Sequence, residues 1–325
     1  MKIPVKKLII FGVLKKILMI AVIMIINTDT AKAGNLDIAV LINNIANPYW
    51  QVINQGIEDS AKELNINIHV QSLSSDGAAE QQLNQCETSL LKQPKALIFA
   101  AVNGVNLGSC LKKAHEQNIL LIDLDGNMDQ ELAKDMGVKI AFSVASNNYD
   151  LGKKAAEYID DKSGKVLIIE GIEGSEPSKL RVNGFKENIN ENIKIVSLQS
   201  GKWDRLRAAD ITNNVMMSHP DLKIIFACND TMALGAVEAL RSKNINNVMV
   251  VGVDGTSDAV KAINSGKLDA SIAQLPYLMA KQAVEKTYNH INNNKEYEFN
   301  QNVPVMVLDK EVISNNKDPL LEYVR

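Results

Sequence analysis

Short, continuous apolar runs alternate along this chain with segments whose apolar residues recur at helical spacing. The first run, Ile38–Ile42, predicts a buried strand, and Tyr49–Leu64 predicts a helix because Trp50, Ile53 and Ile57 recur on one face. The same reasoning predicts further strands over Ile66–Val70, Ala96–Ala100 and Ile119–Leu124, and helices over Ala78–Leu91 and Leu107–Glu116. Strands that are apolar on both faces are typical of a parallel sheet covered by helices on both sides. The sequence therefore predicts an α/β fold with a doubly wound parallel sheet.

The alternation of strands and helices restarts after Ser146. It predicts strands over Lys165–Ile169, Ile193–Leu198, Ile224–Cys228, Met249–Val253 and Ala270–Ala273, and helices over Leu151–Asp160, Leu180–Asn188, Arg207–Met217, Thr231–Lys243 and Ala259–Ser265. Two such blocks predict two similar lobes. A further helix, Tyr277–Asn292, follows the last strand, so we expect the chain to cross between the lobes more than once. The polar tail beyond Leu308 is expected to be peripheral.

The N-terminus has the pattern of a secretory signal. Lysines precede an apolar run, Ile17–Ile26, and the small-x-small sequence Ala31-Lys32-Ala33 follows, as signal peptidase requires. The run is shorter than the ~20 residues that span a bilayer. We therefore expect cleavage after residue 33, with an uncleaved anchor that includes Leu8–Leu14 as the alternative. Cleavage predicts a periplasmic protein of ~290 residues, about the length of two domains.

Composition narrows the function classes. With 35 Lys and Arg against 38 Asp and Glu, the chain lacks the basic excess that a nucleic-acid partner requires. Four histidines and three cysteines show no metal-ligand spacing, so we expect neither a metal nor a cofactor. An oxidising compartment would allow a Cys86–Cys110 disulfide with Cys228 as a buried thiol, whereas three small buried core residues are the alternative.

Polar and aromatic residues follow the predicted strands, where loops of an open α/β sheet converge on a ligand. We take ten of them as candidate ligand-binding residues, namely Asn43, Asn47, Tyr49, Trp50, Asp125, Arg181, Trp203, Asn229, Asp254 and Gln274. Carboxylate, amide and guanidinium groups make strong hydrogen bonds to sugar hydroxyls, and aromatic rings cover the apolar C–H faces of a sugar. The set therefore predicts a polyol site.

Each candidate also has a purely structural interpretation. Asp254-Gly255 is an ordinary turn sequence, and Asn229 or Asp230 is a suitable helix cap. Trp50 could belong to the core, and Arg181 could be a solvated helix charge. The shared placement of these residues after strands favours function. For catalysis there is no supporting pattern: the chain has no complete phosphate loop, and no HExxH or Ser–His arrangement, so we expect no enzyme activity.

An ordered series of motifs resembles the periplasmic ribose- and allose-binding proteins of ABC transporters, which have the type I periplasmic binding protein fold. The motifs are Asn47-Pro48-Tyr49-Trp50, Asp204-Arg205, His219-Pro220-Asp221, Asn229–Gly235, Val250–Thr256 and Ile272–Pro276. The resemblance covers nearly the whole mature chain. It implies an N-terminal lobe over 35–146 and 275–305, a C-terminal lobe over 147–274 and an extension over 306–325, with three hinge crossings and the sugar in the cleft.

The resemblance also assigns the candidates to walls of the cleft. It implies that Asn47, Tyr49, Trp50 and Asp125 lie on the N-terminal lobe, that Arg181, Trp203, Asn229 and Asp254 lie on the C-terminal lobe, and that Gln274 lies at the hinge, while Asn43 matches a contact that varies with the sugar. Ribose binders follow the aspartate with an arginine, whereas Gly126 follows Asp125 here. That departure favours a hexose such as allose or psicose, or a cyclitol such as inositol, over ribose.

The resulting expectation is a monomeric, extracytoplasmic binding protein that closes around a monosaccharide and delivers it to an ABC permease. A receptor accessory that presents a sugar or quorum signal to a chemotaxis or sensor protein is the alternative. Repressors of the same two-lobe fold are disfavoured, because they need a basic helix-turn-helix where this chain has an apolar export signal.

Overall fold

The computed structural model describes residues 37–128 and 130–324. The expected export signal, residues 1–33, lies outside these residues and stays a prediction. Among the described residues, no helix combines the length and apolar character needed to cross a membrane.

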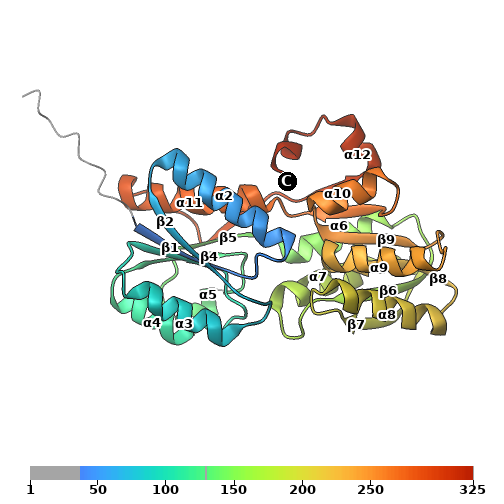
Figure 1. Cartoon of the computed structure of the whole chain (residues 1–325), viewed down its shortest axis with the longest axis horizontal. Coiled ribbons are helices and arrows are strands. Elements are labelled where there is room, and N and C mark those ends of the chain that lie inside the picture. Colours follow the sequence, from blue (N-terminus) through green and yellow to red (C-terminus); the bar gives the residue numbers. More distant parts are fainter. Residues whose placement is uncertain (1–36, 129, 325) are drawn as a thin grey trace, which may run out of the picture. The chain divides into compact units, whose positions relative to one another are not determined.

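Two six-stranded sheets form the framework of the fold (Figure 1). The first sheet has the order β11-β5-β4-β3-β1-β2 and contains β1 (Asp37–Ile42), β2 (Asn67–Ser72), β3 (Ala96–Phe99), β4 (Leu120–Leu124), β5 (Phe142–Ser146) and β11 (Asn300–Val303). The second has the order β12-β10-β9-β8-β6-β7 and contains β6 (Gly164–Glu170), β7 (Ile193–Ser200), β8 (Leu222–Ala227), β9 (Met249–Asp254), β10 (Ala270–Ala273) and β12 (Met306–Asp309). Within the described residues, β10 and β12 form the only antiparallel strand pair. The predicted pair of doubly wound parallel sheets is confirmed.

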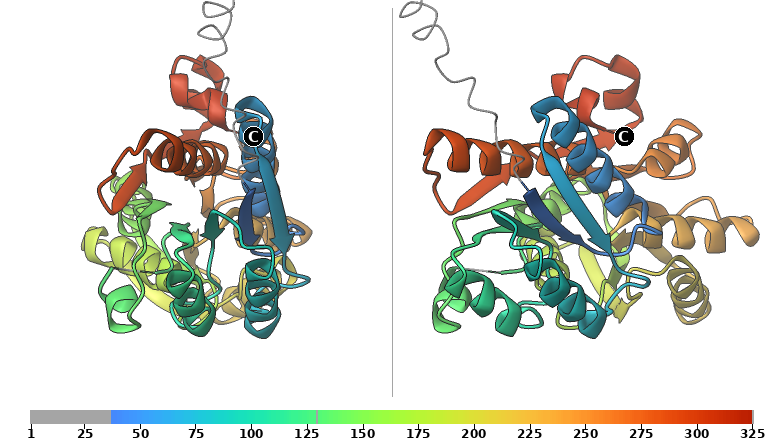
Figure 2. Two further views of the ribbon diagram at one scale, coloured as in Figure 1. Left: turned by 90° about the vertical axis from the view of Figure 1, so that its left-hand side faces the viewer. Right: turned by 60° about the vertical axis from the view of Figure 1, so that its left-hand side comes forward.

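Helices cover both faces of each sheet. The first sheet is flanked by α2 (Pro48–Leu64), α3 (Ala79–Leu90), α4 (Gly108–Glu116), α5 (Gln130–Asp135) and α11 (Pro276–Asn293). The second is flanked by α6 (Asn148–Tyr158), α7 (Glu176–Asn188), α8 (Arg205–Ser218), α9 (Asp230–Ser242) and α10 (Ser257–Asn264), and the chain ends in α12 (Lys310–Asn315) and a short 3₁₀ helix, η1 (Pro319–Tyr323). Among the helices of the first sheet, α2 packs against α11 and α3 packs against α4. Among those of the second sheet, α6 packs against α7 and α8 packs against α9 (Figures 1 and 2).

Continuous apolar strands place the core between each sheet and its helices. In the first sheet, Leu41, Leu97 and Phe99 pack with Leu111 of α4 in one buried cluster. In the second sheet, Phe185 of α7 stacks on Phe226 of β8 with the ring centroids 4.3 Å apart. Burial of such side chains is worth about 1.5–3 kcal/mol each, so the two cores hold the two sheets rigid.

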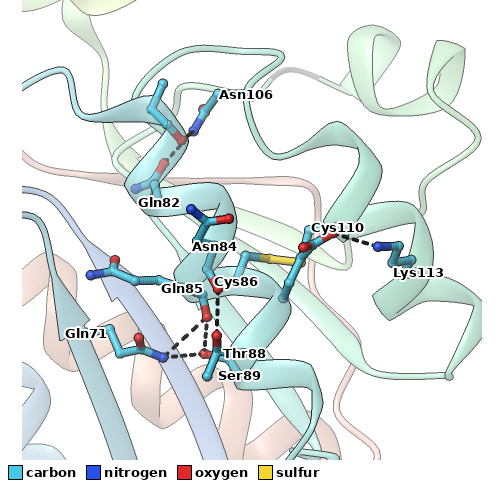
Figure 3. The surroundings of a disulfide bond; sticks show 12 residues. Gln71, Gln82, Asn84, Gln85, Cys86, Thr88, Ser89, Asn106, Cys110 and Lys113 are labelled. Carbon is cyan, nitrogen blue, oxygen red and sulfur yellow. Dashed lines mark hydrogen bonds and ion pairs between the residues drawn. A yellow bond between two sulfur atoms is a disulfide. The ribbon is translucent and has the colours of Figure 1, made fainter.

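Two cysteines of the first core form a disulfide (Figure 3). Cys86 of α3 is bonded to Cys110 of α4, and both side chains are fully buried. Cys228, directly after β8, is a buried free thiol. Of the two alternatives left by the sequence, the structure therefore contains the disulfide.

The chain passes between the two sheets three times. The crossings lie after β5, after β10 and between β11 and β12. The Ser146 hydroxyl donates to the main-chain oxygen of Gln274 at 3.1 Å, which ties the first crossing to the second. The three crossings agree with the hinge that the family resemblance implies.

Six short elements of the described residues have no counterpart in the sequence-based prediction. They are α5, β5, β11, β12, α12 and η1, of four to six residues each. The interpretation of residues 306–325 as a peripheral extension differs from the structure at β12, which forms an edge of the second sheet beside β10. β11 is mostly polar, and its pairing partner β5 lies more than 150 residues earlier in the sequence, so a local pattern does not report it.

Candidate functional site

A cavity lies at the carboxyl ends of strands from both sheets. All ten candidates line it: Asn43, Asn47, Tyr49, Trp50, Asp125, Arg181, Trp203, Asn229, Asp254 and Gln274. The space open to the centre of a water-sized sphere is about 80 Å³, several times what one water molecule needs. The cavity is therefore large enough for a small molecule, and its walls come from segments more than two hundred residues apart.

The register of the sheets explains why these residues meet. Neighbouring parallel strands end at the same edge, as where Ile42 of β1 lies beside Ser72 of β2. Asn43 directly follows β1 and Asp125 directly follows β4, while Asp254 ends β9 and Gln274 follows β10. The strand-end rule thus accounts for the convergence.

The start of α2 supplies one aromatic wall. The Asn47 side chain accepts a hydrogen bond from the Tyr49 main-chain N–H at 3.1 Å, and Pro48 occupies the first helical position, a favourable helix start. Tyr49 and Trp50 are both buried and pack edge to face, with centroids 5.1 Å apart. Since both line the cavity, Trp50 is a wall residue as well as a core residue.

The Tyr49 hydroxyl donates to Asp125 Oδ1 at 2.6 Å. Burial raises the pKa of Tyr49 well above its usual value, and the neighbouring Asp125 carboxylate raises it further, so the phenol keeps its proton and donates. Burial also raises the pKa of Asp125 to about 6, against the lowering effects of the Tyr49 hydrogen bond and of Arg181. Near pH 7 this carboxyl is an acceptor with little water around it.

Arg181 of α7 is the cation of the opposite wall and is only 4% exposed. Its Nε donates to Asn148 Oδ1 at 2.9 Å, and its Nη1 donates to the Cys228 carbonyl at 2.6 Å and to Asp254 Oδ1 at 3.4 Å. These bonds fix the guanidinium plane inside the cavity. The interpretation of Arg181 as a solvated helix charge is wrong.

Asp254 and Gln274 form the floor on the side of the second sheet. Gln274 Nε2 donates to Asp254 Oδ1 at 2.6 Å, while its Oε1 is buried and has no hydrogen-bond partner within the described chain. Burial raises the pKa of Asp254 to about 8, although Arg181 acts in the opposite direction. A buried acceptor without a partner is costly, so a ligand donor at this point would be favourable.

The second aromatic wall is Trp203. The Arg181 guanidinium carbon lies 5.7 Å from the indole centroid, within the range of a cation–π contact. A Cβ atom at Gly171 would overlap the Trp203 ring, so the indole lies directly against this glycine. Gly171, the residue directly after β6, thus serves as the surface against which the Trp203 ring packs.

Three of the ten candidates adopt left-handed backbone conformations. The φ angles are 75° for Asp125, 63° for Trp203 and 122° for Asp254. Such angles are uncommon for residues with a side chain and are a genuine outlier for a bulky one. Strain of this kind concentrates at ligand sites, where the surrounding structure holds it in place.

Asn229 has both of the roles considered from the sequence. It caps α9 by accepting from the Met232 N–H at 2.9 Å, and it lines the cavity. Its neighbour Asp230 is fully buried and accepts from the Ser271 hydroxyl and from the Thr256 N–H, which fastens the turn that follows Asp254.

Seven further residues line the cavity but were not among the candidates, namely Asp76, Gly77, Val102, Asn127, Ile172, Ser175 and Pro177. Asp76 lies in the loop after β2 and Val102 in the loop after β3, so the strand-end rule could have found both. Burial raises the pKa of Asp76 to about 6, and the nearby Asp204 carboxylate adds to the effect. The described residues contain no group of three or more His, Cys, Asp or Glu placed to hold a metal ion.

Residues 38–296 match the profile of a family described as periplasmic binding protein domain. The chain belongs to this family. The family resemblance inferred from the sequence is therefore confirmed.

Periplasmic binding proteins of two kinds are similar over most of the chain. A D-allose-binding periplasmic protein of Escherichia coli is 34% identical over 255 residues, which cover 76% of this chain and 82% of the relative. A ribose import binding protein of the same organism is 32% identical over 252 residues, with the same two coverages.

Solved structures of periplasmic binding proteins share the fold. An ABC transporter periplasmic solute-binding protein of Actinobacillus succinogenes with bound D-allose is 32% identical, with a TM-score of 0.79 over 86% of this chain and 99% of that protein. The Caulobacter myo-inositol binding protein is 22% identical, with a TM-score of 0.78 over 87% and 96% of the two chains. The second likeness concerns the fold alone.

Proposed function

We propose that the protein captures one monosaccharide in the cavity between the two sheets and delivers it to an ABC permease. The observation that carries the proposal is the composition of the cavity wall. Two indoles and a phenol are combined with carboxyl, amide and guanidinium groups, and both sheets contribute to the set. This combination suits a ring with polar edges and apolar faces.

The hydrogen bonds already present leave a defined set of groups for the sugar. Asn47 and Asn229 use their amide oxygens as helix caps, which leaves each amide nitrogen as a donor to a hydroxyl. Gln274 Oε1 is left as an acceptor, and the carboxyl of Asp125 has lone pairs beyond the one that Tyr49 uses. Trp50 and Trp203 would cover the two faces of the ring.

Lobe closure is the mechanism that fits a cavity with walls on two sheets. A ligand favours the closed form only by as much as it binds that form better, so the sugar must contact both walls. Hinge closure around a ligand is a motion characteristic of periplasmic binding proteins. The Ser146–Gln274 hydrogen bond lies at two of the crossings about which the lobes would turn.

The proposed ligand is a hexose of the allose or psicose type, or a cyclitol. The similarity to the allose-bound protein of Actinobacillus succinogenes supports this choice, and so does Gly126, which follows Asp125 where the ribose binders have an arginine. We also infer that the chain acts in the periplasm as a monomer after its signal is removed.

A thermal-shift screen against pentoses, hexoses and inositols tests the proposal, because a ligand of the native state raises the melting temperature by mass action. We expect a rise with one or a few monosaccharides and a 1:1 stoichiometry in calorimetry. Mass spectrometry of the released ligand should recover it unchanged. No shift with any sugar would contradict the proposal, and a chemically altered ligand would indicate an enzyme.

A further inference from the structure

A buried glutamine outside the cavity holds one of its walls in place. Figure 3 shows this residue, Gln82, and its hydrogen bond with Asn106. Gln82 of α3 is fully buried. Its Nε2 donates to the Ala100 carbonyl at 2.8 Å, and its Oε1 accepts from the Val102 N–H at 2.9 Å and from Asn106 Nδ2 at 2.8 Å. One side chain thus makes three hydrogen bonds to a single loop, Ala100–Asn106.

That loop forms part of the cavity wall. Val102 lines the cavity, and so does Asn127, whose Nδ2 donates to the Ala101 carbonyl at 2.8 Å. The loop therefore contributes one wall residue and fixes the orientation of a second. Gln82 binds the residues on either side of Ala101, so it holds the segment that carries Val102 and the carbonyl to which Asn127 donates.

The disulfide secures the same region from the other end. Cys86 lies on α3 one turn after Gln82, and its partner Cys110 is in the first turn of α4, directly after the loop. The loop is consequently fastened to α3 near its start by Gln82 and beyond its end by the disulfide. The cavity-lining Asp76 and Gly77 lie three and two residues before α3, so this helix is close in sequence to a further part of the wall.

We propose that Gln82 is a positioning residue of the ligand pocket and that the Cys86–Cys110 disulfide assists it. The inference rests on the proposed function, since it concerns affinity at the same cavity. Loops are ordered at an entropic cost, and a wall that is already fixed spares the ligand that cost when it binds. Without Gln82, the Ala100 oxygen and the Val102 nitrogen lose their partner, and the loop must move to satisfy them.

The decisive variant is Gln82→Met, which keeps the length of the side chain and removes its hydrogen bonds. The matched control is Gln85→Met on the same helix. Gln85 Nε2 donates to the Ser72 carbonyl at 2.9 Å, at the end of β2, so its side chain is bonded to a different segment from the loop. Each variant loses hydrogen bonding between α3 and the main chain of a neighbouring segment, so both should lose stability. Only Gln82→Met should alter the cavity.

Titration calorimetry with D-allose, D-ribose and myo-inositol measures the affinity, and thermal unfolding measures the stability. We expect Gln82→Met to weaken binding about tenfold and Gln85→Met to leave it within about twofold, because a loosened wall must be ordered again in each binding event. The double variant Cys86→Ser/Cys110→Ser should weaken binding by a smaller factor than Gln82→Met does. When the same two substitutions are made in the Gln82→Met protein, they should weaken binding by a larger factor than they do in the wild type.

The outcomes separate the two proposals. If the wild-type protein binds and Gln82→Met binds equally well, or if Gln85→Met loses as much affinity, the positioning role is overturned while the proposed function stands. A wild-type protein that binds no sugar overturns both. Should Gln82→Met fail to fold, Asn106→Ala removes one of the three hydrogen bonds, together with the bonds of the Asn106 side chain to Asn103 and Ala79, and unchanged affinity in that variant would count against the role.

Discussion

Gly171 and Trp203 show how a single residue without a side chain can shape a binding wall. The indole occupies the space that a Cβ atom at position 171 would need, and its own backbone is held at a φ of 63°. The ring is thus fixed from both sides, by contact with the glycine and by its backbone conformation. An anchor that is rigid before binding loses little entropy when a ligand stacks on it.

We predict that Gly171→Ala displaces Trp203 and weakens sugar binding about tenfold or more, which corresponds to at least ~1.4 kcal/mol. The physical reason is the overlap between the new methyl group and the ring. Titration calorimetry measures the loss. The control is Glu173→Ala, an exposed residue of the same loop, which should bind normally. Normal affinity in Gly171→Ala would show that Trp203 is not a wall of the occupied site.

A second residue-scale prediction concerns pH and Asp254. Burial raises its pKa from the ordinary 3.8 to about 8, so the folded state binds the proton more tightly than the unfolded state. Stability from this group is therefore greatest below pH 4 and is lost as the pH rises from about 4 to about 8. Asp254→Asn removes the titration. The stability of the wild type relative to Asp254→Asn should fall between pH 5 and pH 8 in thermal unfolding of the free proteins.

Sugar hydroxyls that donate to this carboxyl favour its ionised form. The bound ligand should therefore lower the pKa, and the affinity of the wild type should rise between pH 5 and pH 8, because binding then releases a proton. Calorimetry in buffers of different ionisation heats would detect the released proton. Affinity that falls with pH would mean that Asp254 donates to the ligand instead of accepting.

At the scale of elements, the position of the Arg181 guanidinium group depends on how closely α6 and α7 approach each other. Gly152 of α6 lies against the Arg181 carbonyl, and Gly184 of α7 lies against the Tyr149 carbonyl, so that a Cβ atom at either position would overlap the backbone of the other helix. The two glycines set the distance between the helices. Because Asn148 of α6 accepts from Arg181 Nε, the same packing also sets the position of the guanidinium group.

We predict that Gly152→Ala pushes α7 outward, destabilises the protein by about 1–3 kcal/mol through overpacking, and weakens sugar binding. Thermal unfolding and calorimetry measure the two effects. Gly266→Ala is the comparison, because nothing lies within 4 Å of a Cβ atom there and the residue does not line the cavity; its φ of 65° should cost stability alone. Full affinity in Gly152→Ala would contradict the link from helix packing to Arg181.

The sequence predicted these elements best where one physical rule decides the outcome. Ala270–Ala273 is apolar at three of its four positions and forms a strand with those bounds, and ten strand-end and helix-start candidates meet in one cavity. By contrast, the polar Asn300–Val303 forms a strand only because Ser143–Ser146 lies beside it. Gln82 follows no strand, and its effect on the wall depends on a loop eighteen or more residues away, which local patterns do not report.

At the scale of the whole molecule, charge near the cavity opposes closure of the lobes. Asp76 comes from the loop after β2, and Asp204 caps α8 by accepting from the Arg207 N–H at 2.8 Å, so the two belong to the layers of different sheets. Burial and the Asp204 carboxylate together raise the pKa of Asp76 to about 6. Above about pH 6 Asp76 loses its proton, and its repulsion from the Asp204 carboxylate must be overcome whenever the two walls come together.

Asp204→Asn should therefore strengthen sugar binding, because asparagine is an equally good helix cap and only the charge is lost. We expect a gain of about two- to fivefold at low ionic strength, which should shrink in 1 M salt, where the Debye length is about 3 Å. Asp210→Asn, at an exposed position on the same helix, makes the same charge change and should leave the affinity unaltered.

Calorimetry at two salt concentrations measures the gain in affinity. Small-angle scattering of both variants without ligand should show a more compact average structure only for Asp204→Asn. Equal effects from the two variants would assign the gain to net charge, and no gain from Asp204→Asn would mean that the repulsion is absent from the closing step.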